Sequence, residues 1–244
     1  VGSVTAVQGV TVAAESPGKV VAIHFEPGAS VQAGDLLLQQ DTSIEEAMLR
    51  SAEASMALAK VNLERARELI GKATIAQSEL DAADAQFKQA QAQADNVRAT
   101  IAKKTIRAPF AGRLGIRLVN LGQTLKEGDP IVSLQTLDPI FINFTLPQQE
   151  LARLQLGLTV RVSSDAAPGR AFVGQITAIN PDVDAATRNV LVQATLANAE
   201  GSLRPGMFAS VAVVLPAVDP VLAIPATAVL YAPYGDSVFV IEPA

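Results

Sequence analysis

Two segments of this chain repeat one pattern of glycines, and a long helical segment separates them. The first copy contains Gly18, Gly28, Gly34 and Asp35, and the second copy repeats them at a constant offset of 94, as Gly112, Gly122, Gly128 and Asp129. Apolar positions obey the same offset, for example Val20 with Leu114 and Leu37 with Ile131. Glycines in such fixed places are typical of turns with positive φ or of close backbone approach. The repeat therefore predicts two matching β-rich halves that pair into one small domain, with the six glycines at structural turns.

The composition narrows the class of protein. The chain has 244 residues, of which 49% are hydrophobic and 18% charged, so it can bury a core and is long enough for two to four modules. Its net charge of -5 and the lack of a dense Lys/Arg cluster argue against nucleic acid as a partner. The absence of cysteine excludes disulfides, thiolate metal sites and cysteine nucleophiles.

The segment between the two halves, residues 42–104, carries two heptad series. In each series apolar residues alternate at steps of three and four, which is the pattern of a coiled-coil seam. We call these positions the seam: Leu49, Ala52, Met56, Ala59, Leu63, Ala66 and Ile70, then Leu80, Ala83, Phe87, Ala90, Ala94, Val97 and Ile101. The series are near mirror images about position 75, so they predict an antiparallel α-helical hairpin. At ~1.5 Å per residue, its arms of about 28 residues form a rod on the order of 40 Å long.

Capping signals place the ends of the two helices. Ser43 with Glu46 has the form of a capping box at the start of the first helix, and Thr74 with Gln77 has the same form at the start of the second. Gly71 suits a left-handed exit from the first helix. We therefore expect the turn at Gly71 to Thr74.

After Asp138 the pattern becomes one of short strands separated by Pro/Gly turns. Strands are expected at Phe141–Leu146, Leu158–Val162, Ala171–Ile179, Asn189–Leu196 and Met207–Leu215, with a short helix after Pro147. They predict a small β-barrel over residues 138–215, to which part of 1–12 is a candidate addition. We expect residues 216–244 to pair with residues 1–10 as a partial membrane-proximal β-domain.

Several strings, taken in order, resemble one family. They are P-G-K-V at 17–20 with P-G-x-x-V-x-A-G-D at 27–35, T-I-R-A-P-F-A-G-R-L-G at 105–115, G-Q-I-T-A-I-N-P-D-V-D-A-A-T-R-N-V at 174–190, L-R-P-G-M-F at 203–208 and I-P-A-T-A-V at 224–229. Together they resemble the periplasmic adaptor subunits, or membrane fusion proteins, of resistance-nodulation-division (RND) efflux pumps. The resemblance implies a mixed α and β, elongated fold: a lipoyl-like β-sandwich split over 13–41 and 105–137, the inserted hairpin, the barrel and the partial membrane-proximal domain.

The resemblance also implies a function. Such adaptors are non-catalytic, lie in the periplasm attached to the inner membrane, and link an inner-membrane proton-driven transporter to an outer-membrane channel. Six copies are expected in the assembled pump. The family's tip motif, R-x3-L-x6-S, falls on Arg65, Leu69 and Ala76, so the serine is replaced here. We expect the partner-binding tip to comprise Arg65, Leu69, Lys72, Ile75 and Ala76, with an anchoring segment outside this sequence.

Alternatives stay open at this point. An adaptor of an ABC-type exporter shares the same modules, and a lipoyl or biotinyl carrier domain shares the repeat but needs a lysine in the turn that the hairpin replaces. Arg65 is either a tip contact or a partner of Glu68 one turn away. Leu69 either inserts into a groove of the channel or closes the hairpin. No catalytic, cofactor or metal site is predicted, and His24, the single histidine, is interpreted as structural.

Overall fold

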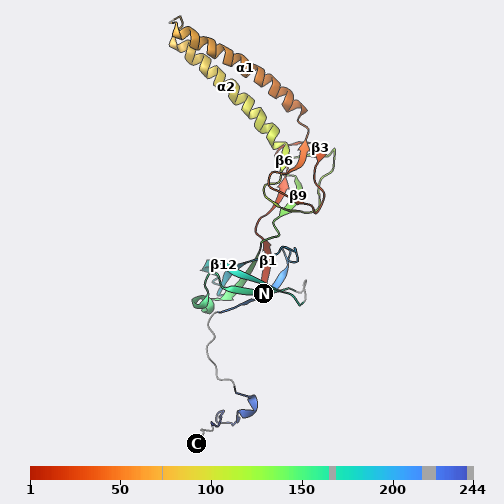
Figure 1. Cartoon of the computed structure of the whole chain (residues 1–244), viewed down its shortest axis with the longest axis vertical. Helices are drawn as coiled ribbons and strands as arrows, with labels where there is room; N and C mark the ends of the chain where they lie inside the picture. Colours follow the sequence, from red (N-terminus) through yellow and green to blue (C-terminus); the bar gives the residue numbers. More distant parts are fainter. Residues whose placement is uncertain (73, 165–168, 216–223, 241–244) are drawn as a thin grey trace.

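The computed structural model describes residues 1–72, 74–164, 169–215 and 224–240. Figure 1 shows an elongated molecule in which a pair of long helices, a small β-sandwich and a β-barrel follow one another along the long axis. The helices leave the sandwich on the side opposite the barrel. The sandwich and the barrel have separate apolar cores.

The sandwich is built from strands of both halves. Its strands are β2 (Gly9–Ala13), β3 (Gly18–Ile23), β4 (Ser30–Val31), β5 (Leu36–Gln40), β6 (Thr105–Arg107), β7 (Gly112–Leu114), β8 (Thr124–Leu125) and β9 (Pro130–Gln135). They form two sheets in the orders β2-β9-β7-β4 and β6-β5-β3-β8. The strands of the two sheets correspond to each other, in the same order, under the repeat offset of 94. Each half of the repeat therefore contributes two strands to each sheet. Neither half can form a complete sheet alone.

The two halves contain matching turns, which directly precede strands β5 and β9. The Asp35 carboxylate accepts the backbone N–H of Gln32 at 2.7 Å, and the Asp129 carboxylate accepts that of Lys126 at the same distance. The glycine before each aspartate is left-handed, with φ of +88° at Gly34 and +86° at Gly128. A side chain would be strained in that conformation, which explains glycine at both places.

Gly18 and Gly112 differ from the expected turns, because they begin strands β3 and β7. A Cβ atom on Gly112 would lie 2.6 Å from the carbonyl oxygen of Gln135 on the neighbouring strand. A Cβ on Gly18 would crowd the side chain of Gln40 at 3.1 Å. These two glycines allow close approach between strands. Gly28 and Gly122, by contrast, both have φ of +80°.

The inserted segment forms helices α1 (Ser43–Gly71) and α2 (Gln77–Lys103), which pack against each other along their length (Figure 1). Every seam position is buried or half-buried, and Ala59, Leu63 and Ala94 are 5% exposed or less. Apolar burial along the seam therefore holds the two helices together.

The expected helix caps were wrong. The N-cap of α1 is Thr42, whose hydroxyl donates to the Glu46 carboxylate at 2.7 Å, while the Ser43 N–H donates to Asp41. At the other end, α2 begins at Gln77 with Ala76 as N-cap, so Thr74 does not cap it. Gly71 is the last residue of α1 and does not have positive φ. The connection between the helices therefore runs over residues 72–76.

The barrel is a closed sheet in the order β1-β10-β13-β12-β11-β14. Its elements are β1 (Gly2–Ala6), β10 (Ile140–Pro147), the 3-10 helix η1 (Gln148–Arg153), β11 (Thr159–Ser163), β12 (Ala171–Val183), β13 (Asn189–Leu196) and β14 (Phe208–Val213). The expected strands and short helix after Asp138 are confirmed to within a few residues at their ends. Ile142, Val160, Val192 and Leu203, each at most 1% exposed, lie in its core.

The expected pairing of residues 1–10 with the C-terminal segment was wrong. β1 pairs with β10 and β14 and completes the barrel, and β2 pairs with β9 in the sandwich. Residues 224–240 contain the short 3-10 helix η2 (Ala226–Ala228) and one bridge between Leu230 and Ser237. Residues 216–223 and 241–244 lie outside the described part. Across the described ranges, no helix has the length and apolarity needed for a membrane span.

Candidate functional site: the hairpin tip and its two faces

The expected tip residues lie around the connection between α1 and α2, at the end of the molecule farthest from the barrel (Figure 1). Arg65, Lys72 and Ala76 are exposed, and Leu69 and Ile75 are half-buried. The carbonyl of Leu69 accepts the N–H groups of Lys72 and Thr74 at 3.1 and 3.0 Å, which turns the chain back. The tip thus presents two cations around two partly buried apolar side chains.

Among the described residues, Arg65 makes no ion pair with Glu68. The ion pairs near the tip use other residues: Arg67 lies 3.6 Å from Asp84 on the facing helix, and Lys88 lies 2.7 Å from the same carboxylate. The Arg65 guanidinium therefore keeps its donors for water or a partner. A guanidinium favours carboxylates, carbonyls and other oxygen acceptors.

The root of the hairpin is a charged site that the sequence did not reveal. The Lys104 ammonium donates to the Glu45 carboxylate at 2.6 Å and to the Asp41 carbonyl at 2.9 Å, with side chains only 11% and 17% exposed for Lys104 and Glu45. The hydrogen bond from Lys104 holds the pKa of Glu45 below its ordinary value, against the opposing effect of burial. This pair joins the start of α1 to the chain that follows α2. Lys104 and Glu45 are far apart in the sequence, so no local sequence pattern predicts their contact.

The two sides of the hairpin differ in charge. On one side, the Arg98 guanidinium bridges Glu53 of α1 at 2.6 Å and Asp95 of its own helix at 2.8 Å, and the Arg67–Asp84 pair lies nearer the tip. Water screens such exposed pairs, and holding two long side chains in one geometry costs entropy. They therefore add little to the stability that the seam provides, and they keep this side hydrated.

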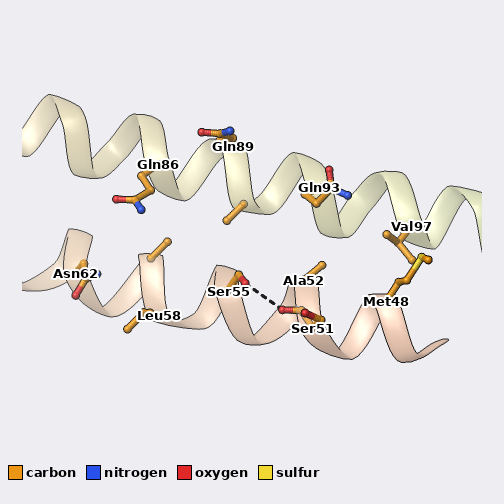
Figure 2. A pocket seen from close by; sticks show the side chains of 12 residues that line it. Met48, Ser51, Ala52, Ser55, Leu58, Asn62, Gln86, Gln89, Gln93 and Val97 are labelled. Atoms are coloured by element: carbon orange, nitrogen blue, oxygen red, sulfur yellow. Dashed lines mark hydrogen bonds between the residues drawn. The ribbon is translucent and has the colours of Figure 1, made fainter. Parts of the chain in front are cut away.

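The other side is a groove between the helices without a single charged side chain. It has a volume of about 680 Å³ and is lined by Met48, Ser51, Ala52, Ser55, Leu58, Ala59 and Asn62 of α1 and by Gln86, Gln89, Ala90, Gln93 and Val97 of α2. Figure 2 shows Met48 beside Val97 at one end and the glutamines along α2. Met48 and Leu58 are 56% and 64% exposed. Depletion of charge together with exposed apolar groups is typical of the core of a protein interface.

No group of three or more His, Cys, Asp or Glu side chains suited to a metal occurs within the described ranges. Asp184 accepts the backbone N–H groups of Thr187 and Ala186 at 2.9 Å each, and these bonds lower its pKa. It stabilises the turn between β12 and β13.

A split sandwich with an inserted helical pair and a following barrel defines the adaptor class of export proteins. Two family models match the chain in this order: "RND MFP, barrel-sandwich hybrid domain" over residues 8–137 and "CusB-like, beta-barrel domain" over residues 139–217. The chain belongs to the RND membrane fusion protein family, the periplasmic adaptors of efflux pumps.

Two curated relatives match nearly the whole chain. An uncharacterized protein of Haemophilus influenzae is 31% identical over 237 residues, which cover 97% of this chain and 62% of the relative. Multidrug resistance protein MdtA of Proteus mirabilis is 28% identical and is matched over 99% of this chain and 64% of its own length. The chain thus spans somewhat less than two thirds of these relatives.

Solved structures show the same fold. A putative efflux transporter from Bacteroides eggerthii is matched with a TM-score of 0.74 at 22% identity, over 99% of this chain and 77% of that one. A MacA–MexA chimeric protein containing the Pseudomonas aeruginosa MexA alpha-hairpin domain is matched with a TM-score of 0.77 at 22% identity, over 89% and 81%.

Proposed function

We propose that this protein is a non-catalytic periplasmic adaptor that links an inner-membrane, proton-driven efflux transporter to an outer-membrane channel for the export of small molecules. The observation that carries the proposal is the position of the hairpin: it leaves the sandwich opposite the barrel, so its tip and the barrel face opposite ends of the molecule (Figure 1). A chain of this shape can contact two partners at once.

Docking of the channel is proposed at the tip. Arg65 is exposed and makes no ion pair among the described residues, so its guanidinium can donate to acceptors on the channel. Leu69 and Ile75 are half-buried beside it and supply apolar contact area. With Ala76 in place of the family serine, the tip lacks one hydroxyl, so docking depends more strongly on Arg65, Lys72 and Leu69.

Lateral assembly is proposed along the charge-free groove. A neighbouring hairpin that covers the groove would bury Met48 and Leu58 without removing water from a charged side chain. Contact through the side with the Arg98 ion pairs would require desolvation of those charges, which costs free energy. Exposed small residues on the helices, such as Ala54, Ala57 and Ala92, allow close approach of a second hairpin. We propose a closed ring of copies, with six as the number expected of the family.

The test of tip docking is Arg65→Asp in the full-length protein, expressed in a strain that lacks its own adaptor. We expect export to be abolished, because a carboxylate repels the acceptors that a guanidinium would bind, while far-UV circular dichroism stays unchanged. Arg50→Asp is the matched control: Arg50 is also exposed on α1 but lies near the root. Export equal to that of the unsubstituted protein with Arg65→Asp would contradict docking through this residue.

The class of transporter is decided by a separate measurement. Affinity capture of the full-length protein from membranes should recover a multi-span transporter together with an outer-membrane channel. Recovery of a nucleotide-binding exporter instead would favour an ABC-type partner and overturn the proton-driven assignment, while leaving the adaptor role in place.

A further inference from the structure

The sandwich and the barrel are joined by two short chain passages. One runs through residues 7–8 between β1 and β2, and the other runs through residues 136–139 between β9 and β10. Extensive packing between elements occurs within each module and not across the junction. The relative orientation of the two modules therefore depends on what holds these two passages, which we call the waist.

A single buried amide holds the second passage to the barrel. Asn198 is 4% exposed and follows β13. Its Nδ2 group donates to the carbonyls of Leu137 and Leu203, both at 2.8 Å, and its Oδ1 accepts the Leu203 N–H at 3.0 Å. Its own backbone N–H donates to the Asp138 carboxylate at 2.7 Å. The side-chain amide of Asn198 thus uses both of its hydrogens and its oxygen. Together with the bond of the backbone N–H, Asn198 makes four hydrogen bonds, and two of them connect to residues of the waist.

The same loop also binds β1, the barrel strand that leads into the first passage. The N–H of Gly206 donates to the carbonyl of Val4 at 2.9 Å, and the N–H of Val4 donates to the carbonyl of Met207 at 2.8 Å. Residues 198–207, which we call the collar, therefore bind the second passage and the strand that leads into the first passage.

On the sandwich side, Thr136 ties the two passages together. Its N–H donates to the carbonyl of Gln8 at 2.9 Å, and its hydroxyl donates to the carbonyl of Ala111 at 3.1 Å. Open clefts of about 480 and 330 Å³ flank this point, each lined by Arg113 of the sandwich and Gly201 of the collar. The modules have room to tilt, and hydrogen bonds rather than packed side chains oppose that tilt.

We propose that Asn198 is a positioning residue: through the collar it sets the angle between the barrel and the sandwich with its hairpin. This role is independent of which partners the adaptor binds. The consequence is large at the tip, because a tilt of about 10° acting over a helix on the order of 40 Å long displaces the tip by about 7 Å. Relative motion of domains is otherwise the default where their interface is small.

The experiment measures distances between spin labels by pulsed electron paramagnetic resonance. The chain has no cysteine, so labels go only where cysteines are introduced. One pair, at the exposed positions Ala99 of α2 and Ser210 of β14, reports the angle between modules; a second pair, at Gln175 and Ser210, lies within the barrel and reports its integrity. Labelled full-length protein is diluted with unlabelled protein so that only intramolecular distances count.

Asn198→Ala should broaden and shift the distance distribution of the first pair and leave that of the second unchanged. The matched control is Asn180→Ala, an exposed asparagine of the same barrel, which should change neither. An unchanged distribution for the first pair in Asn198→Ala overturns the proposal.

If Asn198→Ala also changes the distances of the label pair within the barrel, the variant Thr136→Val is the deciding test. That change removes the hydroxyl contact with Ala111 and leaves the barrel core intact. Broadening of the first pair alone in Thr136→Val supports control of the angle by bonds at the waist, and no broadening overturns it.

Discussion

At the scale of single residues, the ion pair at the hairpin root links stability to pH. Lys104 lowers the pKa of Glu45 from its ordinary value of 4.5. A carboxyl group whose pKa is lower in the folded state stabilises the fold above its unfolded pKa, and this contribution is lost as pH falls through the folded pKa. The stability of the hairpin root should therefore decline on acidification below about pH 4.5.

The corresponding substitution is Glu45→Gln. At pH 7 it should lower the free energy of unfolding by about 1–3 kcal/mol, because the buried ammonium of Lys104 loses its counter-charge. It should also flatten the dependence of stability on pH below the ordinary carboxyl pKa of 4.5. Denaturant titrations followed by circular dichroism at several pH values measure both effects. Glu64→Gln is the control, since Glu64 is exposed and lies 4.0 Å from Lys60; an equal loss of stability in it would refute the special role of Glu45.

The residue scale also shows where sequence patterns were sufficient and where they failed. The glycines at 34 and 128 were predictable because a left-handed turn excludes almost every other residue. The cap of the first helix was missed because Asp41, Thr42 and Ser43 are all residue types that cap helices, so the sequence does not choose among them. Asn198 was missed because nothing local distinguishes an asparagine that clamps a distant chain from one in an ordinary loop.

At the scale of elements, the seam is the main source of stability of the helical pair. Ala59 is 5% exposed within it. Ala59→Lys would place an ammonium among apolar side chains and should lower the free energy of unfolding by about 3 kcal/mol or more, splaying the helices. Thermal melts at 222 nm measure the loss.

Ala57→Lys is the matched control for the seam, since Ala57 is exposed on the same helix and should tolerate lysine. Identical melting curves for Ala59→Lys and the unsubstituted protein would contradict a helical pair held by its seam.

A second prediction at this scale concerns the lateral association of copies through the groove. Gln93→Glu adds one charge to the groove at almost constant volume and should weaken lateral association, because the carboxylate would have to be buried unpaired in the interface. Gln91→Glu makes the same change on the same helix at an exposed position that does not line the groove. Sedimentation or cross-linking of full-length protein measures the difference. Equal association of the two variants would exclude the groove as the contact.

At the scale of the whole molecule, two cores imply two units of stability. Ile142 lies in the barrel core at 1% exposure, and Leu134 lies in the sandwich core at 0%. Ile142→Ala should cost the barrel about 2–5 kcal/mol and leave the helical signal, which comes from the hairpin on the sandwich, largely unaffected. Leu134→Ala should lower the melting temperature of the helices as well.

Hydrogen exchange detected by mass spectrometry separates these outcomes, because it reports each module's amides individually. Faster exchange in the hairpin after Ile142→Ala, equal to that in the barrel, would show that the modules unfold as one and would contradict independent cores.

The order of modules followed from the sequence alone. A repeat of glycines, a heptad pattern and alternating strands are local signals, and each arises from the conformation of a few neighbouring residues. The residue pattern was therefore enough to predict a split sandwich, an inserted helical pair and a following barrel. It also determined where the apolar seam of the helices lies.

The folded structure settles how these parts meet. It assigned β1 to the barrel instead of the C-terminal segment, paired Lys104 with Glu45, formed a groove lined without charge between the helices, and bound the second passage of the waist to Asn198. Each of these contacts joins residues distant in the chain. Their energy depends on burial and on geometry in three dimensions, which no local pattern of residues encodes.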